Sequence, residues 1–369
     1  MMKKNSLALT VLAVALGLSS SFTFAEDSEV NDPYIEGFKA YAAEVKAFSP
    51  EMNGAVSSYA DDVFKTERSV GYIGKLLPIP QAVKIAEGVY TVVGSQIWHN
   101  PSNYGLNNNL SFMIFEDGVF VFNTGANVGL AYALHQQIKA VTDKPVKWVA
   151  VENNQGHAYL GSSYWVDNGV KHLYSSEAAN EQFDIGFPAI KAEWSERVGR
   201  DLTNTVRNVS DKFTTYVDKL EIDVGGGEKV ILQDFGPGHT PASTSLYIPS
   251  RKVYFSGDLG FNERMPVFFR YTDSFAWKES FEAMMAAIPA DTKVVPGHGT
   301  PTDMPTVKRQ TYDYLVYLHD AIDKIAEADG NIDNAIALDQ SQYKDRPVFQ
   351  QASANNAKHV YNEITGGDF

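Results

Sequence analysis

The sequence contains no cysteine. Disulfide bonds, a cysteine-linked lipid anchor and thiolate metal ligands are therefore excluded, which leaves His, Asp, Glu, Asn and Gln as possible metal ligands. Beyond the N-terminal segment the chain also lacks any run of about 18 apolar residues, the length that predicts a membrane-spanning helix. We therefore expect no membrane insertion.

Positive charge is scarce relative to negative charge. The chain has 31 Lys and Arg against 45 Asp and Glu, for a formal net charge of −14 at pH 7. This charge repels phosphate backbones and anionic lipid surfaces, so we expect no nucleic-acid partner. A hydrophobic content of 44% with 12% aromatic residues is ample for a packed core and argues against general disorder. Composition does not predict an oligomeric state.

The first residues have the features of an export signal. Lys3 and Lys4 precede an apolar run from Leu7 to Leu18, and Thr23-Phe24-Ala25 has the small-x-small pattern of a cleavage site. We expect residues 1–25 to be a signal peptide that is cleaved after Ala25. The mature chain is then periplasmic or secreted.

A helical extension is expected over residues 26–80. Asp32-Pro33 has the pattern of an N-cap with proline at the first helical position, and apolar residues then recur every three to four positions from Tyr34 to Phe48. The main α/β domain is expected at 81–305, and helices packed on that same domain at 306–369.

Short β-rich runs alternate with helical patterns in the main domain, which predicts sheets covered by helices. The expected β segments are Val83–Val93, a hairpin of Leu110–Phe115 and Val119–Phe122 around Asp117-Gly118, then Val146–Val151, Lys219–Phe235, Ser245–Ile248, Lys252–Ser256 and Lys293–Val295. The expected helical segments are Leu130–Ala140, a helix-rich insert over Ser175–Tyr216, and a stripe from Leu315 to Ile325 that stops at Gly330.

Four polar residues follow the ends of predicted strands: His157, His239, Asp258 and His298. Rigid strands can direct loop side chains at a single point, so such positions are typical of functional sites. A lone histidine is more often an ordinary hydrogen-bonded residue. The sequences around these four residues favour a functional role over this ordinary one.

Three segments occur in the order and spacing of a known family: Gly236-Pro237-Gly238-His239-Thr240-Pro241, Phe255-Ser256-Gly257-Asp258-Leu259 and Val295-Pro296-Gly297-His298-Gly299. Together they resemble the metallo-β-lactamase superfamily. Asn123-Thr124-Gly125 resembles the family's DTG strand end, while Gly260-Phe261-Asn262 and His359-Val360-Tyr361-Asn362-Glu363 are similar to a branch of periplasmic hydrolases associated with quinoprotein relay and sulfur oxidation. The resemblance covers about Val83 to Phe369.

The resemblance implies a four-layer αββα sandwich that holds one or two zinc ions, with a hydroxide attacking a β-lactam, thioester, ester or similar bond. In that family the site needs an HxHxDH motif after the strand that here ends at Val151, and this chain lacks the motif.

Two alignments of the motif are possible. One pairs His157 with its last histidine and puts Glu152, Asn154 and Gly156 at the other ligand positions. The other, which needs no gap and which we prefer, puts Asn153, Gln155, His157 and Ala158 there. Either alignment replaces both histidines of the first metal site by an amide or a carboxylate, and amide oxygens bind zinc weakly. Asn123, in place of a buried aspartate, indicates the same loss.

A single altered site remains possible. His157, Asp258 and His298, with His239 adjacent, would form a set for one Zn or Fe ion, and Asp258 and His239 are the candidate catalytic residues. The function expected is that of a mononuclear hydrolase acting on a small ester, lactone, thioester or amide-type substrate. The alternative is a pseudoenzyme that binds a ligand or partner at a relic metal site.

Other residues rank lower as functional candidates. The segments Trp98-His99-Asn100-Pro101 and Asn107-Asn108-Asn109 lie before the predicted hairpin, where this fold carries substrate-contacting loops, although polar surface loops are common. We expect His135, His172 and His319 to be solvated.

Overall fold

The computed structural model describes residues 79–367, so the predicted signal peptide and nearly all of the N-terminal extension lie outside the described residues. Two sheets stack face to face. The first has seven strands in chain order: β1 (Val83–Ala86), β2 (Val89–Val92), β3 (Leu110–Ile114), β4 (Val119–Phe122), β5 (Val146–Ala150), β6 (His172–Ser176) and β7 (Phe213–Tyr216). The second has six strands in reverse order: β13 (Thr302–Asp303), β12 (Lys293–His298), β11 (Val253–Phe261), β10 (Thr244–Ile248), β9 (Lys229–Asp234) and β8 (Lys219–Asp223).

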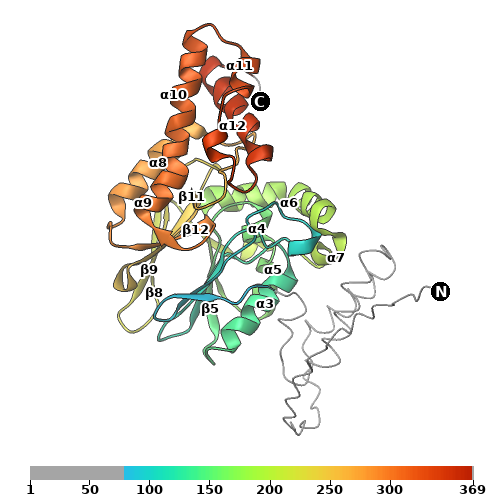
Figure 1. Ribbon diagram of the computed structural model, residues 1–369. Helices are drawn as coiled ribbons and strands as arrows, with labels where there is room; N and C mark the ends of the chain where they lie inside the picture. Colours follow the sequence, from blue (N-terminus) through green and yellow to red (C-terminus); the bar gives the residue numbers. More distant parts are fainter. Residues whose placement is uncertain (1–78, 368–369) are drawn as a thin grey trace, which may run out of the picture.

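Helices cover the outer face of each sheet, as Figure 1 shows. The first sheet packs against α3 (Val128–Lys139), α4 (Gly156–Tyr159), α5 (Ser162–Asp167), α6 (Glu177–Val198) and α7 (Arg200–Thr203). The second packs against α8 (Ser274–Ala287) and α9 (Met304–Val307), and then against the C-terminal helices α10 (Asp313–Glu327), α11 (Ile332–Ile336) and α12 (Phe349–Thr365). The predicted αββα sandwich with a helical tail is therefore confirmed.

A separate apolar core fills each of the three interfaces between layers. Between the sheets, Phe122 of β4 meets Phe255 of β11 edge to face, with ring centroids 5.9 Å apart. All four residues of β4 are buried, because this strand lies between a helical layer and the second sheet. A strand enclosed on both faces is therefore apolar throughout rather than alternating.

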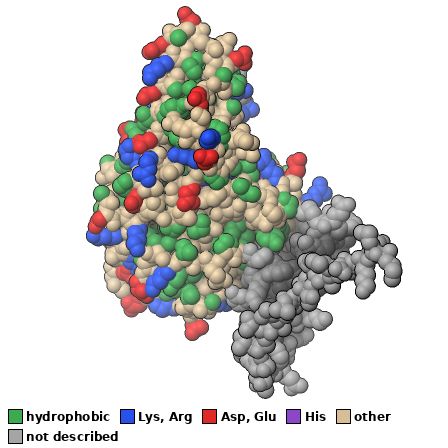
Figure 2. Space-filling view, viewed as in Figure 1, with side chains coloured by type: hydrophobic (Ala, Val, Ile, Leu, Met, Phe, Trp, Pro, Cys, Tyr) green, Lys and Arg blue, Asp and Glu red, His purple; other side chains and the backbone are tan. Residues whose placement is uncertain are grey.

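The C-terminal helices α10, α11 and α12 form a projection at one end of the sandwich (Figure 1). The predicted stripe on α10 is real: Leu315, Leu318 and Ile322 are all buried against the core that also contains α8 and α12. On the face in Figure 2, charged side chains of both signs are spread over the projection and the sandwich, and no histidine is visible.

Several expected boundaries are wrong. The run Val83–Val93 is two antiparallel strands, because Gly88 at φ +65° allows a tight turn between β1 and β2. Strand β6 was not expected, and it pairs in parallel with β5 and β7. Helix α3 begins at Val128, two residues early, because the Asn127 side chain accepts a hydrogen bond from Leu130 N as an N-cap.

The order of the strands determines where the polar residues meet. Strands β11 and β12 run in parallel, with register shifts between Phe255 and Gly257 and again before Phe261. Asp258 and His298 therefore lie within irregular ends of long strands, not just beyond short ones. Among residues 79–367, no helix has the length and apolarity needed to cross a bilayer.

Candidate metal centre

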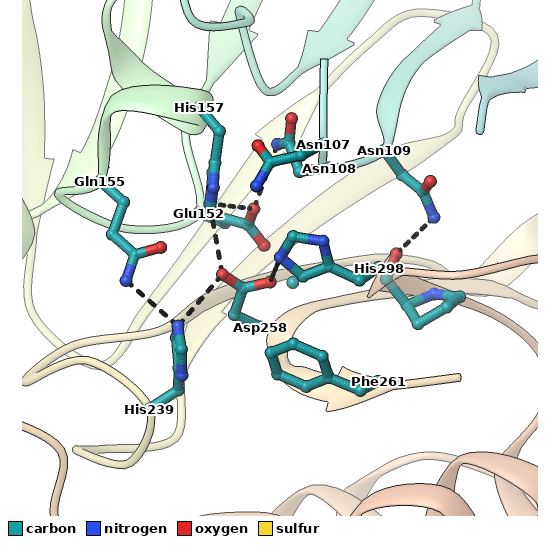
Figure 3. A network of polar contacts seen from close by, with 12 residues as sticks. Asn107, Asn108, Asn109, Glu152, Gln155, His157, His239, Asp258, Phe261 and His298 are labelled. Atoms are coloured by element: carbon teal, nitrogen blue, oxygen red, sulfur yellow. Dashed lines mark hydrogen bonds and ion pairs between the residues drawn. The ribbon is translucent and has the colours of Figure 1, made fainter. Parts of the chain in front are cut away.

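Four segments that are distant in sequence converge at one edge of the sandwich, as Figure 3 shows. His157 lies at the start of α4, after the loop that follows β5, and His239 lies in the loop between β9 and β10. Asp258 belongs to β11 and His298 ends β12. All four side chains are buried. The structure thus brings together the four residues that the sequence singled out.

The carboxylate of Asp258 lies at the centre of the three imidazoles. Its Oδ2 is 3.2 Å from His157 Nε2 and 3.6 Å from His239 Nε2, and its Oδ1 is 3.3 Å from His298 Nε2. The ligating atoms of His157, Asp258 and His298 all lie within 4.8 Å of one another. These three residues form a candidate metal site.

Burial keeps the rings of His239 and His298 neutral. It lowers the pKa of His239 to about 4 and that of His298 to about 3, because a charged ring loses hydration there. For Asp258, burial alone would raise the pKa, but the adjacent His298 and His157 rings hold it well below its usual range. The centre therefore contains a carboxylate that favours its ionised form beside the neutral rings of His239 and His298, which is the state that binds a cation.

A second carboxyl group, that of Glu152, lies beneath the cluster. Its Oε1 accepts hydrogen bonds from Asn123 Nδ2 at 2.9 Å and Asn108 Nδ2 at 3.5 Å, and it is 3.6 Å from His157 Nε2. Burial and the neighbouring Asp258 raise the pKa of Glu152 well above its usual range. Glu152 therefore holds its proton more strongly than an ordinary glutamate does.

Glycine is required beside this acid. Gly257 has φ +53°, and a Cβ on it would lie 2.4 Å from Glu152 Oε2. The Gly257-Asp258 pair is consequently more than a turn signal, because the glycine lets the strand approach the carboxyl of Glu152 closely.

Amide side chains occupy the positions where the preferred alignment would place histidines. Asn153 Nδ2 donates to Asp258 Oδ2 at 3.2 Å, and Gln155 Nε2 lies 3.1 Å from His239 Nε2. Asn154 does not contact the cluster, although its buried Oδ1 lacks a hydrogen-bond partner and the residue lines the adjacent cavity. Asn153, Gln155 and His157, spaced two residues apart, thus all contact the group around Asp258.

The spacing between Asp258 and two of the imidazoles fits a metal ion. Ligands at about 2.0–2.2 Å from a tetrahedral ion lie a little over 3 Å apart, as the Asp258 oxygens and the Nε2 atoms of His157 and His298 do. His157 Nε2 is buried without a hydrogen-bond partner. The Gln155 Nε2 group can only donate, so the lone pair of His239 Nε2 accepts that hydrogen bond. His157 and Asp258 therefore fit an ion in their present arrangement, and His239 lies beside them.

His298 fits on one condition. Arg264 Nη1 lies 2.7 Å from His298 Nδ1, and a guanidinium can only donate, so the ring proton must be on Nε2, facing Asp258. Ligating histidines usually donate through the outer nitrogen to an acceptor. His298 can bind a metal through Nε2 once Arg264 directs its N–H group elsewhere.

A cavity of about 190 Å³ opens beside the cluster. Its walls are largely aromatic, and its polar lining includes His157, His239 and His298. The aromatic side chains are Trp98, Trp194, Phe261, Phe269 and Tyr271. The ring of His99 stacks on Trp194 with centroids 3.8 Å apart. This arrangement suits a small, partly apolar molecule with a bond placed against the polar floor.

Sequence reasoning underrated one segment and missed one residue. His99 belongs to the loop that we ranked low, yet it is buried and lines the cavity. Arg264 was not singled out at all, because a lone arginine after a strand carries no motif. The sequence did offer one indication of Arg264: it lies six residues after Asp258, in a chain with few positively charged residues.

The expectation that three other histidines are solvated is correct only for His172, which is exposed. His135 is half-buried and its Nδ1 lies 2.6 Å from Tyr164 OH. His319 is buried with its Nε2 2.7 Å from Ser274 Oγ, because the C-terminal helices enclose it.

Comparisons with known proteins agree with this architecture. Residues 156–298 match the family model of the metallo-beta-lactamase superfamily, a segment that starts after Gln155 and contains all four clustered residues. Among solved structures, a double mutant of the sec-alkyl sulfatase PisA1 is 16% identical, with a TM-score of 0.59 over 80% of this chain and 51% of that one. A metallo-beta-lactamase from Pontibacter korlensis is 19% identical, with a TM-score of 0.51 over 64% and 99%. The DIM-1 metallo-beta-lactamase exposed to ceftazidime is 15% identical, with a TM-score of 0.50 over 64% and 97%. At such identities the likeness concerns the fold alone.

Proposed function

We propose that this chain, whose residues 156–298 match the family model of the metallo-beta-lactamase superfamily, is a hydrolase with one Zn or Fe ion held by His157, Asp258 and His298, with His239 beside the ion. The observation that carries the proposal is the convergence of three ligand atoms from His157, Asp258 and His298 within 4.8 Å. Imidazole nitrogens around a carboxylate are a donor set suited to either metal.

A bound ion would supply a water of lowered pKa as nucleophile. The chain's own residues would orient and enclose the substrate. Asp258 would hold His157 and His298 in place, the neutral ring of His239 could accept a proton, and the aromatic walls would exclude bulk water. The cavity of about 190 Å³ supports a small ester, lactone, thioester or amide-type substrate.

One ion rather than two is proposed because amides stand beside the cluster. Asn153 and Gln155 both contact it, and neither offers the imidazole nitrogen that a first zinc site requires. These contacts also support the gapless alignment of the altered motif.

A binding protein with a relic site is the second candidate function. The contact of Arg264 with His298 Nδ1 favours it, since in that arrangement the Nε2 proton of His298 occupies the side that would face a metal. A cluster held together by hydrogen bonds alone would account for the same four residues.

Elemental analysis of purified protein separates the two candidates. We expect close to one equivalent of zinc or iron in the wild type and a loss of most of it in His298→Ala. The matched control is His172→Ala, since His172 is exposed on β6 away from the cluster, and it should retain the metal. Metal-free wild-type protein after growth with added zinc and iron would instead establish the binding protein.

Export is part of the proposal and is supported by the N-terminal sequence alone. N-terminal sequencing of the mature protein should begin at Glu26.

A further inference from the structure

The side chain of Arg264 is a buried cation without a carboxylate partner. It is 2% exposed, and among residues 79–367 it forms no ion pair. Its Nε is buried and has no hydrogen-bond acceptor. Uncompensated burial of a guanidinium is costly, so arginines in this situation usually meet an anion when the protein works.

The neighbouring groups position the guanidinium without neutralising it. Its Nη1 contacts His298 Nδ1 at 2.7 Å and the carbonyl oxygen of Asn107 at 3.5 Å, while the Trp98 ring lies 5.4 Å from the guanidinium carbon. Burial lowers the pKa of Arg264 to about 10, so the group remains charged at neutral pH. A preorganised charge that faces a cavity loses little entropy when it binds a ligand.

The cavity contains a second polar group without a partner. Both ring nitrogens of His99 are buried and unpaired, and burial lowers the pKa of His99 to about 3. Its neutral ring offers one donor and one acceptor. Arg264 and His99 line the same cavity as His157 and His298. Two independent unsatisfied side chains thus point to the polar groups of one ligand.

We propose that the substrate carries an oxyanion group, separate from the bond that is cleaved, which Arg264 binds while His99 donates a hydrogen bond to the same molecule. This inference rests on the proposed function, because the bound molecule is a substrate only if the protein is a hydrolase. The ligand class is a small carboxylate or sulfate with an apolar body against Trp98 and Phe269.

Charge in the cavity favours one negative charge on that group over two. The carboxyl group of Glu193 lines the wall. A dianion such as phosphate would meet more repulsion from this carboxylate than a monoanion would.

The proposal also accounts for the position of Arg264 beside His298. When the oxyanion takes the Nη1 hydrogen bond, His298 is free to carry its proton on Nδ1 and to present Nε2 to the centre. Oxyanion binding and metal binding at His298 should therefore favour each other.

Calorimetric titration of metal-stripped protein tests the proposal with benzoate, methyl sulfate and inorganic phosphate as probes. We expect saturable binding of benzoate or methyl sulfate, weaker binding of phosphate, and a loss of about tenfold or more in affinity in Arg264→Gln. The matched control is Arg197→Gln, because Arg197 also lies over the Trp98 ring, at 5.8 Å, but pairs with Glu193 and is half-exposed. That variant should bind the probes like the wild type.

A second measurement keeps the test decisive if Arg264→Gln does not fold. The Arg264 Nε–H resonance, assigned with Arg264→Lys, should shift on titration of the wild type with methyl sulfate. Equal probe affinity in Arg264→Gln and wild type, or no binding and no resonance shift in the wild type, would overturn the proposal. Because these titrations use no metal, a failure here is independent of the metal content that decides the proposed function.

Discussion

Two buried carboxyl groups with opposite pKa shifts lie side by side at the base of the site. Burial and the neighbouring Asp258 raise the pKa of Glu152 despite two amide N–H groups that favour its ionised form, whereas the His298 and His157 rings lower the pKa of Asp258 despite its burial. Like charges this close cannot both ionise at low cost, so a proton on Glu152 favours the negative charge on Asp258.

Replacing Glu152 by glutamine should change how stability depends on pH. The folded state raises the pKa of Glu152, so it holds a proton that the unfolded state releases above about pH 4.5. Wild-type stability should therefore fall as pH rises from about 5 to 8, by up to about 1.4 kcal/mol per pH unit, relative to Glu152→Gln. Urea unfolding of metal-stripped protein at both pH values measures this difference.

Glu181→Gln is the control, because Glu181 is exposed on α6. It should follow the pH dependence of the wild type. Parallel stability profiles for the wild type and Glu152→Gln would mean that Glu152 is ionised in the folded protein.

At the scale of elements, one side chain ties the C-terminal helix to the sandwich. Glu363 of α12 accepts a hydrogen bond from Ser274 N at 2.8 Å and another from Ser274 Oγ, at the first residue of α8. His359, one turn earlier on α12, lies 3.4 Å from the same carboxylate. A carboxylate at a helix N-terminus is stabilised by unpaired N–H groups and by the helix dipole.

Glu363→Ala should therefore weaken the attachment of α12. We expect a loss of about 1–3 kcal/mol in the free energy of unfolding, since Ser274 loses its acceptor in a buried environment. Hydrogen exchange should show faster exchange in α12 than in the sheets. The control is Glu279→Ala, because Glu279 is exposed on α8. This variant should change neither the free energy of unfolding nor the exchange in α12. A similar loss in Glu279→Ala would contradict the role given to Glu363.

At the scale of the whole molecule, the sandwich places a polar edge opposite an aromatic loop. The loop containing Trp98 and the strands β11 and β12 belong to different parts of the chain, and stacking of the two sheets brings them to one cavity. Asn109 links these parts directly, because its Nδ2 donates to the carbonyl groups of Pro296 and Gly299 at 2.8 Å. The cavity is consequently a property of the assembled sandwich.

The altered site should make the protein a poor β-lactamase. Under the one-ion proposal, Asn153 and Gln155 stand where a first zinc ion would need imidazoles, so the doubly coordinated hydroxide of a two-zinc site would not form. We expect turnover of a chromogenic cephalosporin to be far below the ordinary enzyme range of roughly 1–1000 per second. Rates within that range in zinc-supplemented protein would refute the one-ion proposal.

Local signals in the sequence were sufficient for the main outline. The hairpin at Asp117-Gly118, the buried strand Val119–Phe122 and the stripe on α10 depend on turn chemistry and periodicity, which act over a few residues. The four polar residues could be named in advance because they follow predicted strands and because the segments around them resemble a known family.

The tertiary structure alone decided how those residues interact. Whether Glu152 is protonated, which nitrogen of His298 carries the proton, and whether Arg264 has a partner all depend on groups brought from distant segments into a buried region. Sequence determines which side chains are available and which local elements carry them. Their charge states and unsatisfied bonds arise from burial and from neighbours far along the chain, and these exist only after the two sheets have stacked.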